Sequence, residues 1–270
     1  MTSRQEQRQQ ARARLKAGEA AIKAGVPVVA PRADLIGIAT VLLRQLHDTD
    51  SPDRASRAAE LAHSLTQAST RRTPGVAKLA CAKGCGWCCH AWVGALAPEV
   101  FLLAGALRGD ATRQPGEIER ILEASDRTRG KSPAERMGAR LPCPVLVDNA
   151  CSRYRERPNV CRQVTSLDLA GCIEEYAGRN TGADIRVSSV YLAHSRNARL
   201  PLLAAMRAAG LPGTIYELSA ALAHALSQSN AEQRWLAGED VFAGIATAPT
   251  DPHEVRRAVE DIQKELESPN

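Results

Sequence analysis

Eight cysteines, confined to one stretch of the chain, constrain the fold most. All eight lie between Cys81 and Cys172, and the rest of the 270 residues contain none. Thiols that served only as small core hydrophobes would not keep to such a border, so the clustering indicates one local chemical purpose. A chain of this length buries a core without disulfide staples. We interpret the cysteines as metal ligands or reactive thiols, and the candidate ligands are Cys81, Cys85, Cys88, Cys89, Cys143, Cys151, Cys161 and Cys172.

The rest of the sequence limits the compartment in which the protein is expected and the partners that it is expected to bind. Residues 1–16 are rich in Gln and Arg and lack the apolar segment of a signal peptide. No apolar run approaches the length of about 18 residues that a membrane-spanning helix needs. We expect a cytoplasmic protein without a membrane partner, in a compartment that keeps thiols reduced. The net charge is only +5 and aromatic residues make up 3%, too few for base stacking, so we expect no nucleic-acid partner.

Helical spacing of Ala and Leu dominates both ends of the chain and predicts a mainly α-helical fold. A loop-rich cysteine module with a small β-hairpin is embedded between the helices. We expect amino-terminal helices over 1–75, the module over 76–180, and carboxyl-terminal helices over 181–270 that pack on the module. Predicted helices cover 35–46, 55–65, 98–107, 117–129, 215–226 and 230–236, followed by a polar helix opened by Asp251 and Pro252 that we expect to be loosely attached.

Two segments show strand signals. Val145, Leu146 and Val147 precede Asp148 and Asn149, which are turn residues, so a small hairpin is expected before Cys151. The stretch 185–191 is a second strand candidate.

The first cysteine group has the spacing Cys-x3-Cys-x2-Cys-Cys, from Cys81 to Cys89. Spacings of four and three place the first three sulfurs on one side of a helical turn or a tight loop. Gly84 and Gly86 remove side-chain bulk and admit positive φ there. The adjacent cysteines project in different directions, so they serve two metals or one of them is not a ligand.

The second group runs from Cys143 to Cys172. Pro158 is suited to the first turn of a helix, which places Cys161 where the helix dipole favours a thiolate. Nearby guanidinium groups, including Arg157 and Arg162, are candidates to hold the cofactor by hydrogen-bonding sulfur and offsetting the charge of a tetrathiolate site. Alternatively, these arginines form only the exposed, basic first turn of a helix and do not contact a cofactor.

Together the two groups resemble a known family. The first spacing, followed by Cys-Pro-x6-Cys-x2-Tyr-x2-Arg-Pro-x2-Cys-Arg over 143–162, is similar to the YkgJ-type cysteine-cluster family, also described as a zinc- or iron-chelating domain, over about residues 78–176. The resemblance carries over seven cysteines, and Cys172 is similar to an eighth found in one branch. A branch that methylates flagellin lysines is understood to hold [4Fe–4S]. That resemblance makes a similar cluster possible here. It implies S-adenosylmethionine as co-substrate only under the alternative of a methyltransferase.

The identity of the metal stays open between two chemistries. A knuckle-like hairpin and an all-cysteine set suit structural Zn²⁺, whereas the adjacent cysteines and the surrounding arginines suit a [4Fe–4S] cluster, which we prefer. Eight thiolates suffice for two centres. The fragment Cys81-x3-Cys85-x-Trp87-Cys88 also matches the radical S-adenosylmethionine signature, but the strand and helix alternation of the corresponding barrel is missing.

The function predicted is metal binding with a structural, redox or protein-interaction role. The alternative is an iron–sulfur-dependent group-transfer enzyme, such as a protein lysine methyltransferase, so whether the protein is an enzyme is left open. Motifs for hydrolase nucleophiles, phosphate loops and zinc proteases are absent. His90 directly follows the first group, and we interpret it as a residue beside the ligands or at the surface rather than as a ligand. Trp92 is expected to shield the metal from water.

Overall fold

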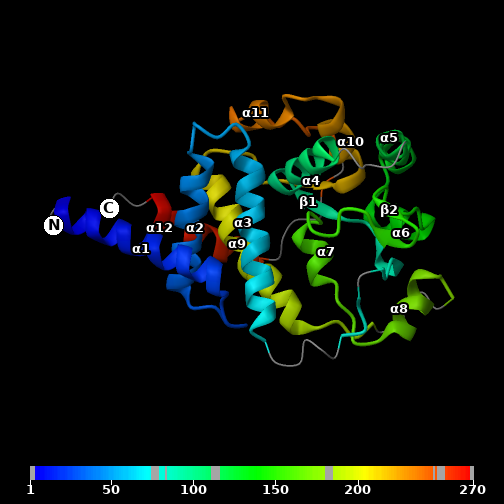
Figure 1. Ribbon diagram of the computed structural model, residues 1–270, viewed down its shortest axis with the longest axis horizontal. Helices are drawn as coiled ribbons and strands as arrows, with labels where there is room; N and C mark the ends of the chain where they lie inside the picture. Colours follow the sequence, from blue (N-terminus) through cyan, green and yellow to red (C-terminus); the bar gives the residue numbers. More distant parts are fainter. Residues whose placement is uncertain are drawn as a thin grey trace.

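The structure is a computed structural model, and it describes residues 4–73, 79–82, 84–110, 116–179, 185–245, 247 and 253–267. Within these ranges the chain is mainly α-helical, as predicted, with two small antiparallel sheets of two strands each (Figure 1). No helix in the described ranges has the length and apolar character required to cross a bilayer.

A helical bundle forms one side of the molecule, where both termini lie (Figure 1). The central helix α9 contacts α2, α3, α7 and α12, and α1 packs along α2. Close approach of α1 and α2 depends on Gly18, because a Cβ there would lie 2.0 Å from the carbonyl oxygen of Gly37. The bundle helices are α1 (Arg4–Ala24), α2 (Arg32–Leu46), α3 (Arg54–Arg71), α9 (Ser189–Ala208) and α12 (His253–Glu267).

The last helix corrects one expectation. Instead of trailing loosely, α12 packs against α2 and α9 and buries Val259 and Ile262. Its apolar residues share one face, so it is amphipathic rather than charged all round. The predicted start at Asp251 and Pro252 lies outside the described residues.

Two strand–helix units join this bundle to the cysteine module. Strand β1 (Gly94–Leu96) leads into α4 (Ala97–Gly109), and β4 (Ile215–Glu217) leads into α10 (Leu218–Ser227). The two strands pair antiparallel, with Gly94 opposite Glu217. Helix α10 also contacts α4 and α5 (Glu117–Thr128), while α11 (Ala231–Leu236) supplies the fully buried Trp235. Segments more than a hundred residues apart therefore form one wall beside the cysteines.

The module itself is built from short elements. The predicted hairpin is present: Leu146 pairs with Cys151 and Val147 with Ala150. Asp148 and Asn149 both have positive φ, as a tight two-residue hairpin turn requires. The elements are the 3-10 helix η2 (Trp87–His90), α6 (Pro133–Ala139), β2 (Leu146–Val147), β3 (Ala150–Cys151), α7 (Asn159–Gln163) and α8 (Leu169–Tyr176).

The second strand prediction, over 185–191, is wrong. Only Val187 makes a β-bridge, to Ser166, and from Ser189 onward the chain is helical. Short runs of β-branched residues do not separate a strand from the start of a buried helix. The isolated bridge nevertheless holds the segment 165–168 beside the first cysteine.

Candidate metal centre

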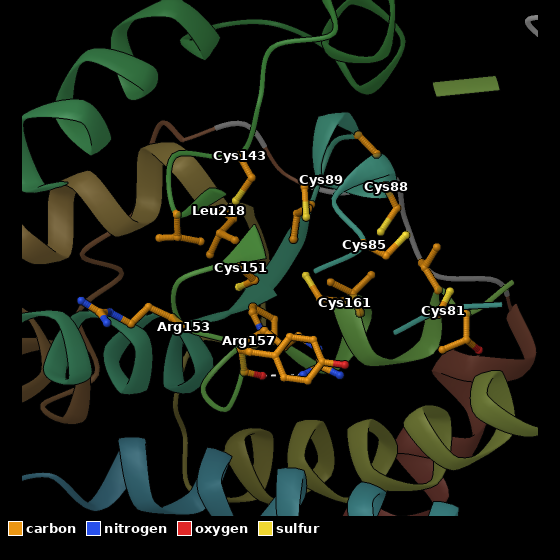
Figure 2. A pocket seen from close by; sticks show the side chains of 18 of the residues that line it. Cys81, Cys85, Cys88, Cys89, Cys143, Cys151, Arg153, Arg157, Cys161 and Leu218 are labelled. Carbon is orange, nitrogen blue, oxygen red and sulfur yellow. Dashed lines mark hydrogen bonds between the residues drawn. The ribbon is translucent and has the colours of Figure 1, made fainter. Parts of the chain in front are cut away.

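Seven of the eight cysteines line a single cavity of about 130 Å³ (Figure 2). Their thiols come from both halves of the predicted module, so the fold brings together groups that are far apart in sequence. All eight cysteines are free thiols. The seven that line the cavity are Cys81, Cys85, Cys88, Cys89, Cys143, Cys151 and Cys161.

Backbone hydrogen bonds hold these segments in place. The N–H of Cys143 donates to the carbonyl oxygen of Cys89 at 2.7 Å, which joins the hairpin to η2. The N–H of Ala80 donates to the carbonyl oxygen of Ser166 at 2.9 Å, and the N–H of Ser166 in turn donates to the sulfur of Cys81 at 3.1 Å. Peptide N–H groups directed at sulfur are typical of thiolate sites.

The two glycines of the first group have different roles. Gly84 has a φ of +95°, a conformation that other residues rarely adopt. At Gly86 the reason is space: a Cβ would lie 2.5 Å from Oδ1 of Asn149 in the hairpin turn. The expectation that glycine is needed here is confirmed at both positions.

The adjacent cysteines Cys88 and Cys89 stay close together, and their service of two metals, one of the alternatives from the sequence, stays a prediction. Cys88 and Cys89 both sit on η2 and line the same cavity. A hydrogen bond from the Cys89 thiol lowers the pKa of Cys88 to about 7, and the same bond, together with burial, raises the pKa of Cys89. Cys88 is therefore the thiol most ready to ionise in the metal-free protein.

Deeper in the cavity, burial governs the thiols. It raises the pKa of Cys143 to about 12 and that of Cys161 well above its usual range. Cys161 does lie in the first turn of α7, but burial outweighs the predicted helix-dipole effect. A buried thiolate without a compensating cation is costly, so a bound metal cation would stabilise these sulfurs in the ionised form.

The electrostatic neighbours of the thiols form two overlapping sets. Burial and the nearby thiols Cys85, Cys88 and Cys172 raise the pKa of Cys81, and Cys85 and Cys88 act in the same way on Cys172. The pKa of Cys161 is raised by burial and by Cys143, Cys88 and Cys151. That of Cys89 is raised by its hydrogen bond with Cys88, by burial and by Cys143 and Cys161, so Cys88 and Cys89 link the two sets. We name them the outer group, Cys81, Cys85, Cys88 and Cys172, and the inner group, Cys89, Cys143, Cys151 and Cys161.

Cys172 is the one cysteine that does not line the cavity. It is buried on α8 and hydrogen-bonds with the side chain of Ser166, the residue whose N–H donates to Cys81. Helix α8 contacts η2, which carries Cys88. Cys172 thus lies near the outer group, although it does not line the cavity.

Arg157 and Arg162 were predicted to hydrogen-bond to sulfur, but both bond to backbone carbonyl groups instead. Arg157 lines the cavity, and its guanidinium stacks on the Tyr154 ring at 3.5 Å from the centroid (Figure 2). Its hydrogen bond goes to the carbonyl oxygen of Tyr154, and those of Arg162 go to the carbonyls of Arg155 and Arg157. Arg162 does not line the cysteine cavity. Their positive charges lie near sulfur without a sulfur hydrogen bond in the described ranges.

His90, the last residue of η2, and Trp92, two residues further on, face different cavities. His90 interacts through Nδ1 with the carbonyl oxygen of Trp87 and faces a different cavity. Trp92 lines the cysteine cavity together with the apolar residues Leu103, Val145 and Leu218. These side chains give one part of the cavity an apolar surface, and the shielding of sulfur from water by Trp92 stays a prediction.

The sulfurs surround a space rather than converge on one point. Among the described residues, no three His, Cys, Asp or Glu side chains are arranged so that they would hold a metal ion directly. The donor chemistry nevertheless fits a thiophilic metal, because seven free thiols face one another with no acidic side chain in the lining. Binding requires the thiols to turn inward around the bound group.

Sequence reasoning missed the pair that supports this site from below. His63 on α3 and Glu99 on α4 are both buried, with Nε2 and Oε1 3.2 Å apart. Glu99 also accepts the backbone N–H of Asn159 at 2.7 Å. Thirty-six positions separate the two side chains, and only the position of Glu99 in the first turn after Pro98 signals a structural role for it.

The fold and the cavity define a mainly α-helical protein with a cysteine-cluster module. Residues 80–181 match the model of the CxxCxxCC family, described as "Putative zinc- or iron-chelating domain". The match confirms the family resemblance predicted from the cysteine pattern and supports a metal-binding cysteine cluster. Searches of curated proteins and of solved structures returned no match.

Proposed function

We propose that the cysteine module binds a [4Fe–4S] cluster through the inner group and a second metal centre through the outer group. The observation that carries this proposal is the convergence of seven free thiols on one cavity. Its volume, about 130 Å³, is several times the roughly 10–15 Å³ that one water molecule needs. A polynuclear cluster uses such a space better than a single ion does.

Zinc is the competing occupant. A structural zinc site closes four ligands tetrahedrally around one ion at about 2.3 Å from each sulfur. Thiols that line a cavity from several sides match a zinc site less well than a cluster site, because a cluster places each iron beside its own cysteine. The inner group also contains Cys143 and Cys161, whose pKa values are raised strongly by burial, and this favours it as the site of the cluster.

When bound, a [4Fe–4S] cluster supplies one-electron redox chemistry and rigid cross-links between the segments it joins. The chain contributes three properties. Arg157 places a positive charge beside the sulfurs. Trp92, Val145 and Leu218 exclude water, and the N–H of Ser166 stabilises the Cys81 thiolate. Hydrogen bonds, charge and exclusion of solvent are the means by which proteins set cluster potentials.

Anaerobic purification tests the proposal, with iron, zinc and acid-labile sulfide measured alongside the visible spectrum. A brown protein with about four iron and four sulfide ions for one cluster, or about eight of each for two, is expected. A colourless protein with stoichiometric zinc and no sulfide contradicts it.

A further inference from the structure

A second, larger cavity adjoins the cysteine pocket on the side of α3. Its volume is about 690 Å³, within the range typical of small-molecule sites. Cys81, Tyr154, Arg157 and Thr165 line both cavities, so they form a shared wall. A ligand in the second cavity would lie beside the outer cysteine group.

The lining of this cavity carries an excess of positive charge. Four arginines face it and only two carboxylates, those of Glu60 and Glu156. His63 adds no charge near neutral pH, because burial lowers its pKa. The excess of about two positive charges matches a dianion. The arginines are Arg71, Arg155, Arg157 and Arg162.

Two of these guanidinium groups, those of Arg157 and Arg162, lie close together and form no ion pair in the part of the chain that the structure describes. The hydrogen bonds of Arg157 and Arg162 go to backbone carbonyls, and no carboxylate in the described ranges forms an ion pair with either. Arg157 lies close enough to Arg162 for their charges to repel each other, and Glu99 and Glu156 offset part of that repulsion. Partly buried cations that repel each other are stabilised by a bound anion.

A second observation points to a ligand. His63 lines the cavity and is buried, with Nε2 bound to Glu99, and its Nδ1 has no hydrogen-bond partner among the described residues. Because Glu99 is ionised through its hydrogen bonds, the proton of the neutral imidazole belongs on Nε2 and Nδ1 is an acceptor. An unpaired buried acceptor costs free energy that a donor group on a ligand would recover.

We propose that this cavity binds an organic phosphate, with its phosphate group held by Arg71, Arg155 and Arg162. Guanidinium groups bind phosphate oxygens in pairs. The cavity is far larger than a phosphate ion, and the apolar and aromatic surfaces of Leu79, Leu102 and Tyr191 remain for the organic part. The hydroxyl of Ser64 is a further donor.

Calorimetric titration of the metal-loaded protein at fixed ionic strength tests the proposal with three probes: inorganic phosphate, phenyl phosphate and succinate. The variant is the double substitution Arg71→Gln with Arg155→Gln. Both arginines are exposed and neither lines the cysteine cavity, so the metal content should not change. The matched control is Arg8→Gln with Arg44→Gln, which removes two exposed arginines outside the cavity.

Saturable binding is expected for both phosphates, tighter for phenyl phosphate than for inorganic phosphate. The cavity variant should raise the dissociation constant at least about tenfold, since a charge-assisted hydrogen bond contributes more than the roughly 1.4 kcal/mol that corresponds to tenfold. The control should change it less than about twofold. Absence of saturable binding, equal weakening in the control, or tighter binding of succinate than of either phosphate would each overturn the proposal. Metal content is measured in parallel, so that a failure to bind phosphate can be distinguished from a failure to bind the cluster.

Discussion

The Glu99 carboxylate accepts the backbone N–H of Asn159 at 2.7 Å and so ties α4 to the first residue of α7. The same carboxylate accepts the N–H of Leu96 at 3.0 Å and contacts His63 Nε2. Its two oxygens therefore join α3, α4 and α7 below the cysteine cavity. Because Cys161 lies in the first turn of α7, Glu99 fixes the position of an inner-group sulfur without touching it.

Replacing this carboxylate should destabilise the protein. Glu99→Ala leaves the N–H groups of Leu96 and Asn159 and the His63 ring without their acceptor in a buried place. We expect the free energy of unfolding to fall by about 3–5 kcal/mol, as when one partner of a buried charged network is removed. Urea unfolding measures it. The exposed Glu123→Ala on α5 is the control and should change stability by less than about 0.5 kcal/mol. An equal effect of both variants would contradict the role of Glu99.

Stability of the metal-free protein should decrease as pH falls below about 6.5, the usual pKa of histidine. Burial lowers the pKa of His63, His194 and His224 in the folded state. The unfolded state therefore binds more protons below that pH, and the free energy of unfolding falls with decreasing pH. Glu99, whose pKa is lowered by its hydrogen bonds with His63, extends the loss below about 4.5.

His63→Gln tests the share of one residue in this pH dependence. The glutamine amide can still donate to Glu99, while the titrating group is gone. The slope between pH 5 and 6.5 should become shallower by up to about 1.4 kcal/mol per pH unit. His253→Gln, at the exposed start of α12, serves as control. An unchanged slope in His63→Gln would mean that this imidazole titrates normally in the folded protein.

Single serine substitutions should separate the two cysteine groups. Cys161→Ser removes an inner ligand and should release the [4Fe–4S] cluster and loosen residues 76–180, because metal binding supplies folding energy to such modules. Cys85→Ser and Cys172→Ser should each release only the outer centre and leave the cluster spectrum in place. Metal analysis, the visible spectrum and hydrogen exchange measure these effects. Loss of the whole spectrum in Cys172→Ser, or unchanged metal content in Cys161→Ser, would refute the grouping.

Gly86→Ala should damage the site by steric conflict alone. The added methyl group would lie 2.5 Å from Oδ1 and 2.8 Å from the carbonyl oxygen of Asn149, which displaces the hairpin from η2. A loss of about 1–3 kcal/mol in the free energy of unfolding is expected. Gly105→Ala is the matched control, since Gly105 lies exposed within α4 with nothing within 4 Å of its Cβ position. That substitution should stabilise the protein by about 0.4–1 kcal/mol. Thermal unfolding of both variants tests these two expectations.

Local features could be predicted from the sequence because they depend on neighbouring residues. The apolar spacing over 98–107 and 117–129 predicted α4 and α5. The turn residues Asp148 and Asn149 predicted the hairpin. The long central helix α9 was missed, because its start was predicted as a strand. The short helices α6 and α8 were missed as well, although Ser132 and Asp168 accept N-terminal N–H groups in the manner of ordinary caps.

The grouping of the thiols could not be predicted from spacing. The sequence divides the cysteines at the gap between Cys89 and Cys143. In the structure Cys89 is influenced by Cys143 and Cys161 as well as by Cys88, and Cys172 is influenced by Cys85 and Cys88, an exchange of neighbours between the two segments. That exchange depends on hydrogen bonds between distant segments, such as the N–H of Cys143 to Cys89 and the N–H of Ala80 to Ser166. The contact between His63 and Glu99 is equally non-local.

The pairing of β1 with β4 has a consequence for the order of assembly. Leu218 lines the cysteine cavity, and its N–H donates to the carbonyl oxygen of Val93 at 2.9 Å. During synthesis all eight cysteines leave the ribosome before this residue does. The nascent chain thus presents its complete set of thiols while one wall is still missing, and the pocket closes only after all of its thiols have been synthesised.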